Sequence, residues 1–141
     1  MVRALKVIAV GAVLVASGCG GSGDDGASTA ASGQEVLAGH WTGRLHQQGL
    51  APFTVTATIE SPTGSSGNEV HYTGIDCSGT WTYLGSSEST YRFREVIERG
   101  HGGKCKGVGV VTLTTGSSTD RLGYEFKGGG VTSRGTLRRV G

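Results

Sequence analysis

The chain has 141 residues and a formal net charge of +2, and only 17% of its residues are charged. Such a balanced charge gives no support for a strongly charged partner, so nucleic-acid binding is not expected. Glycine is abundant, at 27 residues, whereas aromatic residues make up only 6%. This composition is typical of a small antiparallel β protein with tight turns and is unfavourable for long helices.

The first 18 residues have the pattern of an export signal. Arg3 and Lys6 supply positive charge, residues 7–15 are apolar, and the small residues 16–18 precede Cys19. The apolar stretch is too short to span a membrane, which takes about 20 residues. The segment resembles a bacterial lipobox, whose cysteine becomes the mature N-terminus. This resemblance implies that Cys19 carries a diacylglyceryl group and an N-acyl chain such as palmitate. The alternative is an ordinary secretory signal with a chance cysteine.

Residues 19–36 are expected to join this anchor to the folded domain. Residues 20–33 contain no apolar side chain larger than alanine, so they cannot bury a face. A tether of glycine, serine and alanine behaves as a flexible coil. We therefore expect a protein held at the outer face of the cytoplasmic membrane, within the cell envelope, by lipid on Cys19.

Residues 37–141 are expected to form one β domain. The clearest strand pattern is in residues 50–59, where Phe53, Val55, Ala57 and Ile59 alternate with threonines. A short turn is possible at residues 34–38. Strands are expected at 39–47, 50–59, 69–75, 78–84, 90–98, 108–114, 122–126 and 131–139.

Eight short strands joined by short connections predict an all-β meander. Consecutive strands with short connections pair as antiparallel neighbours, and closure of eight such strands removes exposed edges. The prediction is a closed or nearly closed barrel, with a β-sandwich as the alternative. We expect the domain to be monomeric.

The remaining cysteines, Cys77 and Cys105, are expected to form a disulfide. An exported protein is in an oxidising compartment, and the lipid on Cys19 accounts for the odd cysteine. Free thiols and a metal site are the alternatives. His101 lies near Cys105, but the spacing of histidines and cysteines matches no metal-binding motif. No metal or cofactor is expected.

Glu95 is the one chemical anomaly in the predicted strands. It falls on the apolar side of residues 90–98, between Phe93 and Ile97, and a buried carboxylate needs a partner. It could contact a ligand or act as an acid or base. It could instead be satisfied by an arginine or a tyrosine hydroxyl, or be displaced by a bulge. Tyr72, which also points inward, is a second candidate ligand contact.

The segment Gly39-His40-Trp41 is similar to the G-x-W motif of lipocalin-like barrels. That similarity implies that Trp41 packs under a basic residue from the end of the domain, and Arg138 or Arg139 could supply it. Trp41 and Arg138 are therefore included among the possible ligand contacts. Alternatively, Trp41 is simply a core aromatic residue.

A wider resemblance involves several short motifs in order. They are Cys77-Ser78-Gly79-Thr80-Trp81, the alternating Tyr91, Phe93, Glu95 and Ile97, Gly103-Lys104-Cys105, and Gly135-Thr136-Leu137-Arg138. In this order the chain resembles small exported lipoproteins of actinobacteria, Streptomyces-type included, and extracellular parts of some membrane serine/threonine kinases. The resemblance covers residues 41–139 and implies the domain boundary and the disulfide, but no catalytic residue.

These features favour a membrane-anchored envelope lipoprotein whose barrel recognises a small ligand or a protein without catalysis. A protein–protein role, as a protease inhibitor or a sensor domain, is the alternative. An enzyme is the third hypothesis, and it is ranked last because the sequence contains no nucleophile–base motif. A lumen larger than about 300 Å³ would favour a small ligand. A lumen filled by Phe53, Tyr72, Trp81 and Phe93 would exclude one.

Overall fold

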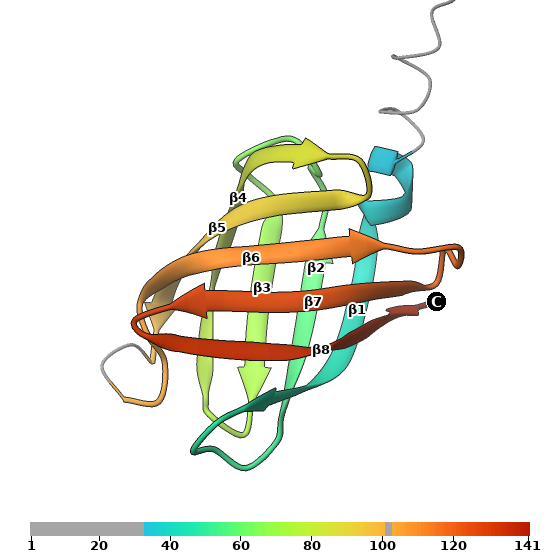
Figure 1. Cartoon of the computed structure of the whole chain (residues 1–141). Helices are drawn as coiled ribbons and strands as arrows, with labels where there is room; N and C mark the ends of the chain where they lie inside the picture. The colour runs from blue at the N-terminus through green and yellow to red at the C-terminus, as the bar shows by residue number, and fades with distance from the viewer. Residues whose placement is uncertain (1–32, 101–102) are drawn as a thin grey trace, which may run out of the picture.

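The computed structural model describes residues 33–100 and 103–141. Eight strands form a closed barrel in which each strand pairs antiparallel with its sequence neighbours, and β1 pairs with β8 (Figure 1). The strands are β1 (Gly39–Gln47), β2 (Phe53–Ile59), β3 (Asn68–Thr73), β4 (Cys77–Ser87), β5 (Thr90–Arg99), β6 (Val108–Thr115), β7 (Arg121–Gly128) and β8 (Val131–Val140). The predicted meander is confirmed, and the barrel is closed rather than a sandwich.

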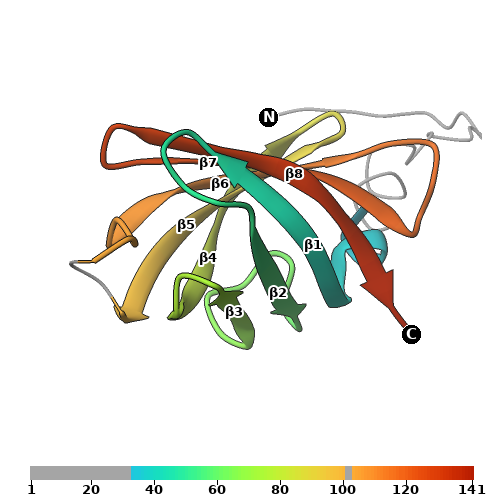
Figure 2. The same cartoon turned by 90° about the horizontal axis from the view of Figure 1, so that it is seen from below.

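The barrel has two distinct ends. The β3–β4 and β5–β6 connections lie at one of them, which carries the Cys77–Cys105 bond and is called the disulfide end below. A short helix at residues 33–37 lies at the other, the helix end. The last strand also ends there, so the chain enters and leaves the barrel on the same side, as Figures 1 and 2 show.

Most strand boundaries differ from the predicted ones by one to three residues, and two of these differences have a clear local cause. β2 begins at Phe53 rather than residue 50, because Pro52 has no amide hydrogen to give to the ladder and Leu50 N–H closes a turn onto the Gln47 carbonyl, at 3.2 Å. β4 continues to Ser87, past the predicted end at residue 84. The register shifts between Tyr83 and Gly85, which leaves Leu84 without a ladder partner, so the chain forms a bulge at Leu84–Gly85 and not a chain reversal.

Period-two alternation places the large apolar side chains inside the barrel. Trp41, Trp81 and Phe93 are fully buried, and Leu37 from the short helix is buried at the helix end. The predicted turn at 34–38 is thus mostly this helix, which begins inside the segment expected to be linker. The Val36 carbonyl in this helix and the carbonyl of Ala38, directly after it, accept hydrogen bonds from Arg139.

Inward-facing glycines permit the β1–β8 closure. A Cβ atom on Gly43 would collide with the Thr136 carbonyl oxygen, and one on Gly135 with the Arg44 carbonyl oxygen. These two glycines lie on facing strands. Their missing side chains let the first and last strands approach closely while leucines on either side fill the interior.

Candidate functional site

Glu95 points into the barrel, as the alternation of β5 indicates. Only 2% of its surface is exposed. It lies between Trp81 on β4 and Gly109 on β6 in the ladder, and the register shifts of β4 fall on either side of this pair, so no bulge turns the carboxylate outward.

A hydrogen-bonded network satisfies the buried carboxylate. The Tyr72 hydroxyl and the Trp81 Nε1–H both donate to Glu95 Oε2, the latter at 2.8 Å. Because the Tyr72 proton is used in this way, the Tyr124 hydroxyl donates to the Tyr72 oxygen, at 2.8 Å. These four residues are called the Glu95 network below. The tyrosine partner was one of the alternatives that the sequence left open.

Burial controls the protonation of this network. It raises the pKa of the Glu95 carboxyl above its ordinary value, although the hydrogen bonds from Tyr72 and Trp81 oppose the shift. Burial also raises the pKa of Tyr72 and of Tyr124 well above that of a free phenol, and the neighbouring Glu95 adds to both shifts. Both phenols therefore keep their protons, and the carboxyl gains one more readily than an exposed glutamate.

The network is not arranged as a paired acid and base. Within residues 33–100 and 103–141, no hydrogen bond joins Glu95 to a histidine or to a second carboxylate. The same part of the chain contains no group of three or more histidine, cysteine, aspartate or glutamate side chains that could hold a metal ion. The geometry by itself identifies no reaction.

Most of the barrel interior is filled by side chains. Trp81 packs against Phe93 and Tyr124, with ring centroids 5.8 and 6.3 Å apart, and Phe53 meets Tyr72 edge-on at 6.0 Å. A cavity of about 30 Å³ remains next to Glu95 at the disulfide end. That volume has room for one or two water molecules and is far below the 300 Å³ or more of ordinary ligand pockets.

The cavity passes from a buried polar end to an exposed rim. Glu95, Tyr72 and Tyr124 lie at its inner end, and Ile75, Phe126 and other apolar side chains form its walls. Exposed Lys104 and Lys106 form its rim, and half-buried Gln47 and buried Ser133 complete the polar part of its lining. The Ser133 hydroxyl donates to Gln47 Oε1 at 2.6 Å.

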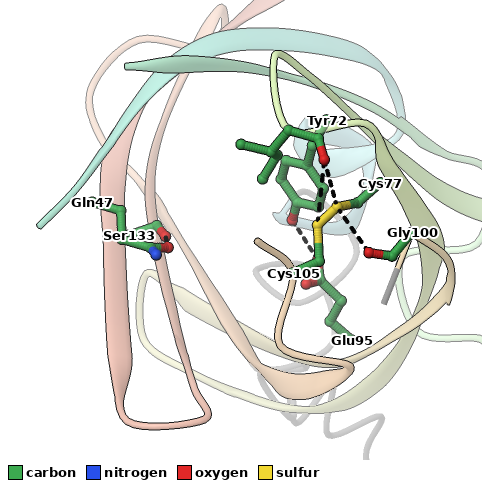
Figure 3. The surroundings of a disulfide bond; sticks show 8 residues. Gln47, Tyr72, Cys77, Glu95, Gly100, Cys105 and Ser133 are labelled. Carbon is green, nitrogen blue, oxygen red and sulfur yellow. Dashed lines mark hydrogen bonds between the residues drawn. A yellow bond between two sulfur atoms is a disulfide. The ribbon is translucent and has the colours of Figure 1, made fainter. Parts of the chain in front are cut away.

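The predicted disulfide is present at this rim. Cys77 begins β4, Cys105 lies in the β5–β6 connection, and their Cα atoms are 6.5 Å apart. Figure 3 shows the bond inside the ring of strands beside Tyr72 and Glu95, with Gln47 and Ser133 on the other side of the ring. His101, weighed above as a neighbouring metal ligand, lies outside the described residues.

Trp41 and Arg138 are not part of this site. Trp41 is buried at the helix end, where its Nε1–H donates to the Leu37 carbonyl at 2.8 Å. Of the two candidate arginines, it is Arg139 that covers the indole, with its guanidinium carbon 4.4 Å from the ring centroid. Arg138 lies exposed on the outer surface. The structure therefore brings Glu95 and Tyr72 together and leaves the other two candidates apart from them.

Tyr124, Lys104 and Lys106 line the cavity but were not among the predicted site residues. Tyr124 lies on an alternating strand that the sequence did indicate, yet its meeting with Tyr72, 52 residues earlier, depends on the whole barrel. The lysines flank Cys105, so the predicted disulfide was the one signal that could have placed them at a barrel mouth.

Comparison with known proteins adds no functional assignment. Neither a scan against family models nor a search of curated proteins finds a match for this chain. In the part of the chain that the structure describes, no helix is both long enough and apolar enough to cross a membrane.

Proposed function

We propose that this protein is a lipid-anchored envelope lipoprotein whose barrel is a non-catalytic module that recognises another protein through its outer surface. The observation that carries the proposal is the filled interior. A cavity of about 30 Å³ beside Glu95 leaves no room for a drug-sized or lipid-sized ligand. Recognition must then use the rims, loops or outer faces of the barrel.

The anchor part of the proposal is supported by the leader and by the geometry of entry. Cys19 lies outside the described residues, so its acylation is argued from the lipobox resemblance alone. The chain enters the barrel at the helix end. An anchor attached there leaves the disulfide end as the part of the domain farthest from the attachment point.

Cross-linking in native membranes can test the proposal. The full-length lipidated protein would carry a C-terminal affinity tag and be cross-linked before purification, with partners quantified by mass spectrometry. Cys19→Ser serves as the matched control for membrane placement. We expect a protein partner that is enriched with the lipidated protein and reduced with the control.

A small molecule bound in place of a protein partner would contradict the proposal. Native mass spectrometry of the purified lipidated protein would reveal a small molecule bound inside the barrel as a fixed added mass. A stoichiometric small molecule, together with no enriched protein partner, would overturn the proposal.

A further inference from the structure

We infer that the mouth at the disulfide end, around Lys104 and Lys106, binds an acidic segment of a partner protein. Both side chains are exposed, and both line the rim of the cavity. Within the described part of the chain neither forms an ion pair. Two exposed lysines therefore line one cavity, and neither has an ion-pair partner among the described residues.

The disulfide gives these lysines a fixed position. Cys105 lies between them and is bonded to Cys77 at the start of β4. The Ile97 amide also donates to the Gly107 carbonyl, at 2.6 Å, which ties the far end of the segment to β5. A segment held on both sides loses less conformational entropy on binding than a mobile loop would.

Nearby carboxylates are mostly engaged elsewhere. Glu125, on the outer surface, already binds Lys127 and Arg134, at 2.7 and 2.8 Å. Glu95 is buried and accepts two hydrogen bonds at one oxygen. Two exposed carboxylates, Asp76 in the β3–β4 connection and Glu98 near the end of β5, lie at this end of the barrel, where Lys104, Lys106 and Arg99 outnumber them. The local field at the rim is therefore positive, although the whole chain is almost neutral.

The chemistry of the rim favours an acidic peptide over an anionic polymer. Half-buried Ile75 lines the same cavity as the lysines and offers an apolar contact, and half-buried Gln47 offers a side-chain amide. A protein segment can present a carboxylate next to an apolar side chain, whereas a polyphosphate chain has no group for the apolar walls. The cavity itself admits only water, so the segment binds across the mouth without entering the barrel.

This inference rests on the proposed function and specifies which end of the domain is used. The mouth lies opposite the helix through which the chain enters. On a protein anchored at Cys19 it is thus the end most accessible to a partner in the envelope.

A peptide selection tests the inference. The full-length lipidated protein, held in nanodiscs of zwitterionic lipid, would be used to select from displayed random dodecapeptides, with empty nanodiscs as counter-selection. We expect the selected peptides to be enriched in aspartate and glutamate next to apolar residues. Their affinity, measured by fluorescence anisotropy, should fall at least tenfold with Lys104→Glu/Lys106→Glu.

Arg92→Glu/Arg94→Glu is the matched control. It makes the same change in net charge on the exposed side wall of β5, away from the mouth. We expect this variant to weaken the selected peptides less than twofold. Thermal melts establish that both variants are folded, since all four substituted side chains are exposed.

Several results would overturn the inference. The selection could yield no enriched peptide, or only peptides without acidic residues. The two double variants could weaken peptide binding equally. Finally, the mouth could bind polyphosphate and select no acidic peptide. A cross-linked membrane partner whose binding ignores Lys104→Glu/Lys106→Glu would overturn this site and leave the proposed function intact. Absence of any cross-linked partner would count against the proposed function itself.

Discussion

Replacing Arg139 by methionine should strongly destabilise the barrel, whereas the same change at Arg138 should not. The Arg139 guanidinium donates to the Ala38 and Val36 carbonyls, at 2.6 and 2.5 Å, and covers the Trp41 ring at 4.4 Å. It therefore binds the C-terminal end of the short helix and the residue after it to the end of β8. Arg138, one residue earlier, is exposed on the outside of the barrel.

The contacts set the expected size of the effect. A hydrogen bond from a charged group contributes about 1.5–3 kcal/mol, and a partly exposed cation over an indole about 0.5–1 kcal/mol. Arg139 is half-buried, so we take values near the lower ends. Methionine also keeps part of the contact with the ring. Arg139→Met should then cost about 3 kcal/mol, a fall in Tm of about 12–24 °C for a domain of this size.

Urea denaturation of the full-length protein, followed by tryptophan fluorescence, measures the difference. Trp41 and Trp81 are both fully buried, so unfolding changes their emission. Arg138→Met should change the free energy of unfolding by less than about 0.5 kcal/mol. Arg139→Lys should be intermediate, because lysine keeps the charge but cannot donate to two carbonyls in a fixed fork.

Equal effects of the two arginine substitutions would refute this reasoning. So would an Arg139→Met protein as stable as the wild type. Either result would mean that the guanidinium contacts with the helix are not made in solution, and that the pairing of Trp41 with Arg139 does not hold the helix end of the barrel.

Three further predictions concern Glu95 and the cysteines. Burial raises the pKa of Glu95 in the folded protein. The stability that protonated Glu95 contributes is therefore fully present below the ordinary glutamate pKa, and it is lost as pH rises through the raised pKa of the folded state. Urea titrations should show this loss in the wild type and none in Glu95→Gln; identical pH profiles would contradict it. Removing the Cys77–Cys105 bond, which spans 28 residues, should cost about 3–4 kcal/mol, and an unchanged Tm after reduction would argue against the bond. Cys19→Ser should move the protein from the membrane fraction to the soluble fraction, whereas continued retention would rule out the lipid anchor.

Much of the fold was predictable because one face of each strand is buried. In β2, apolar residues alternate with threonines because one face of the strand packs in the barrel interior and the other faces solvent; the apolar residues are Phe53, Val55, Ala57 and Ile59. The same rule put Glu95 inside. The strand predicted to end at residue 84 is longer in the structure, and the sequence alone did not show this because a glycine such as Gly85 is compatible with a turn and with a β-bulge equally well.

The site was less predictable because it depends on register across many strands. Glu95 was predicted to point inward from its own strand, but its hydrogen-bond partners come from β3 and β4, and the tyrosine that completes the network comes from β7. No local pattern states which of several inward tyrosines reaches it. The choice between Arg138 and Arg139 is of the same kind, since one residue of register exchanges the inner and outer faces of β8.

The pairing of β1 with β8 also determines the order in which this barrel can be assembled. The chain is synthesised from its N-terminus, so His40 cannot pair with its ladder partner Val140 until the last strand has been made. Cys77 and Cys105 come together within β4, β5 and their connections, so they can bond while β8 is still missing. Until the last strand arrives, two open edges are available for pairing with other chains. A truncation of residues 131–141 alone would make that vulnerable intermediate permanent.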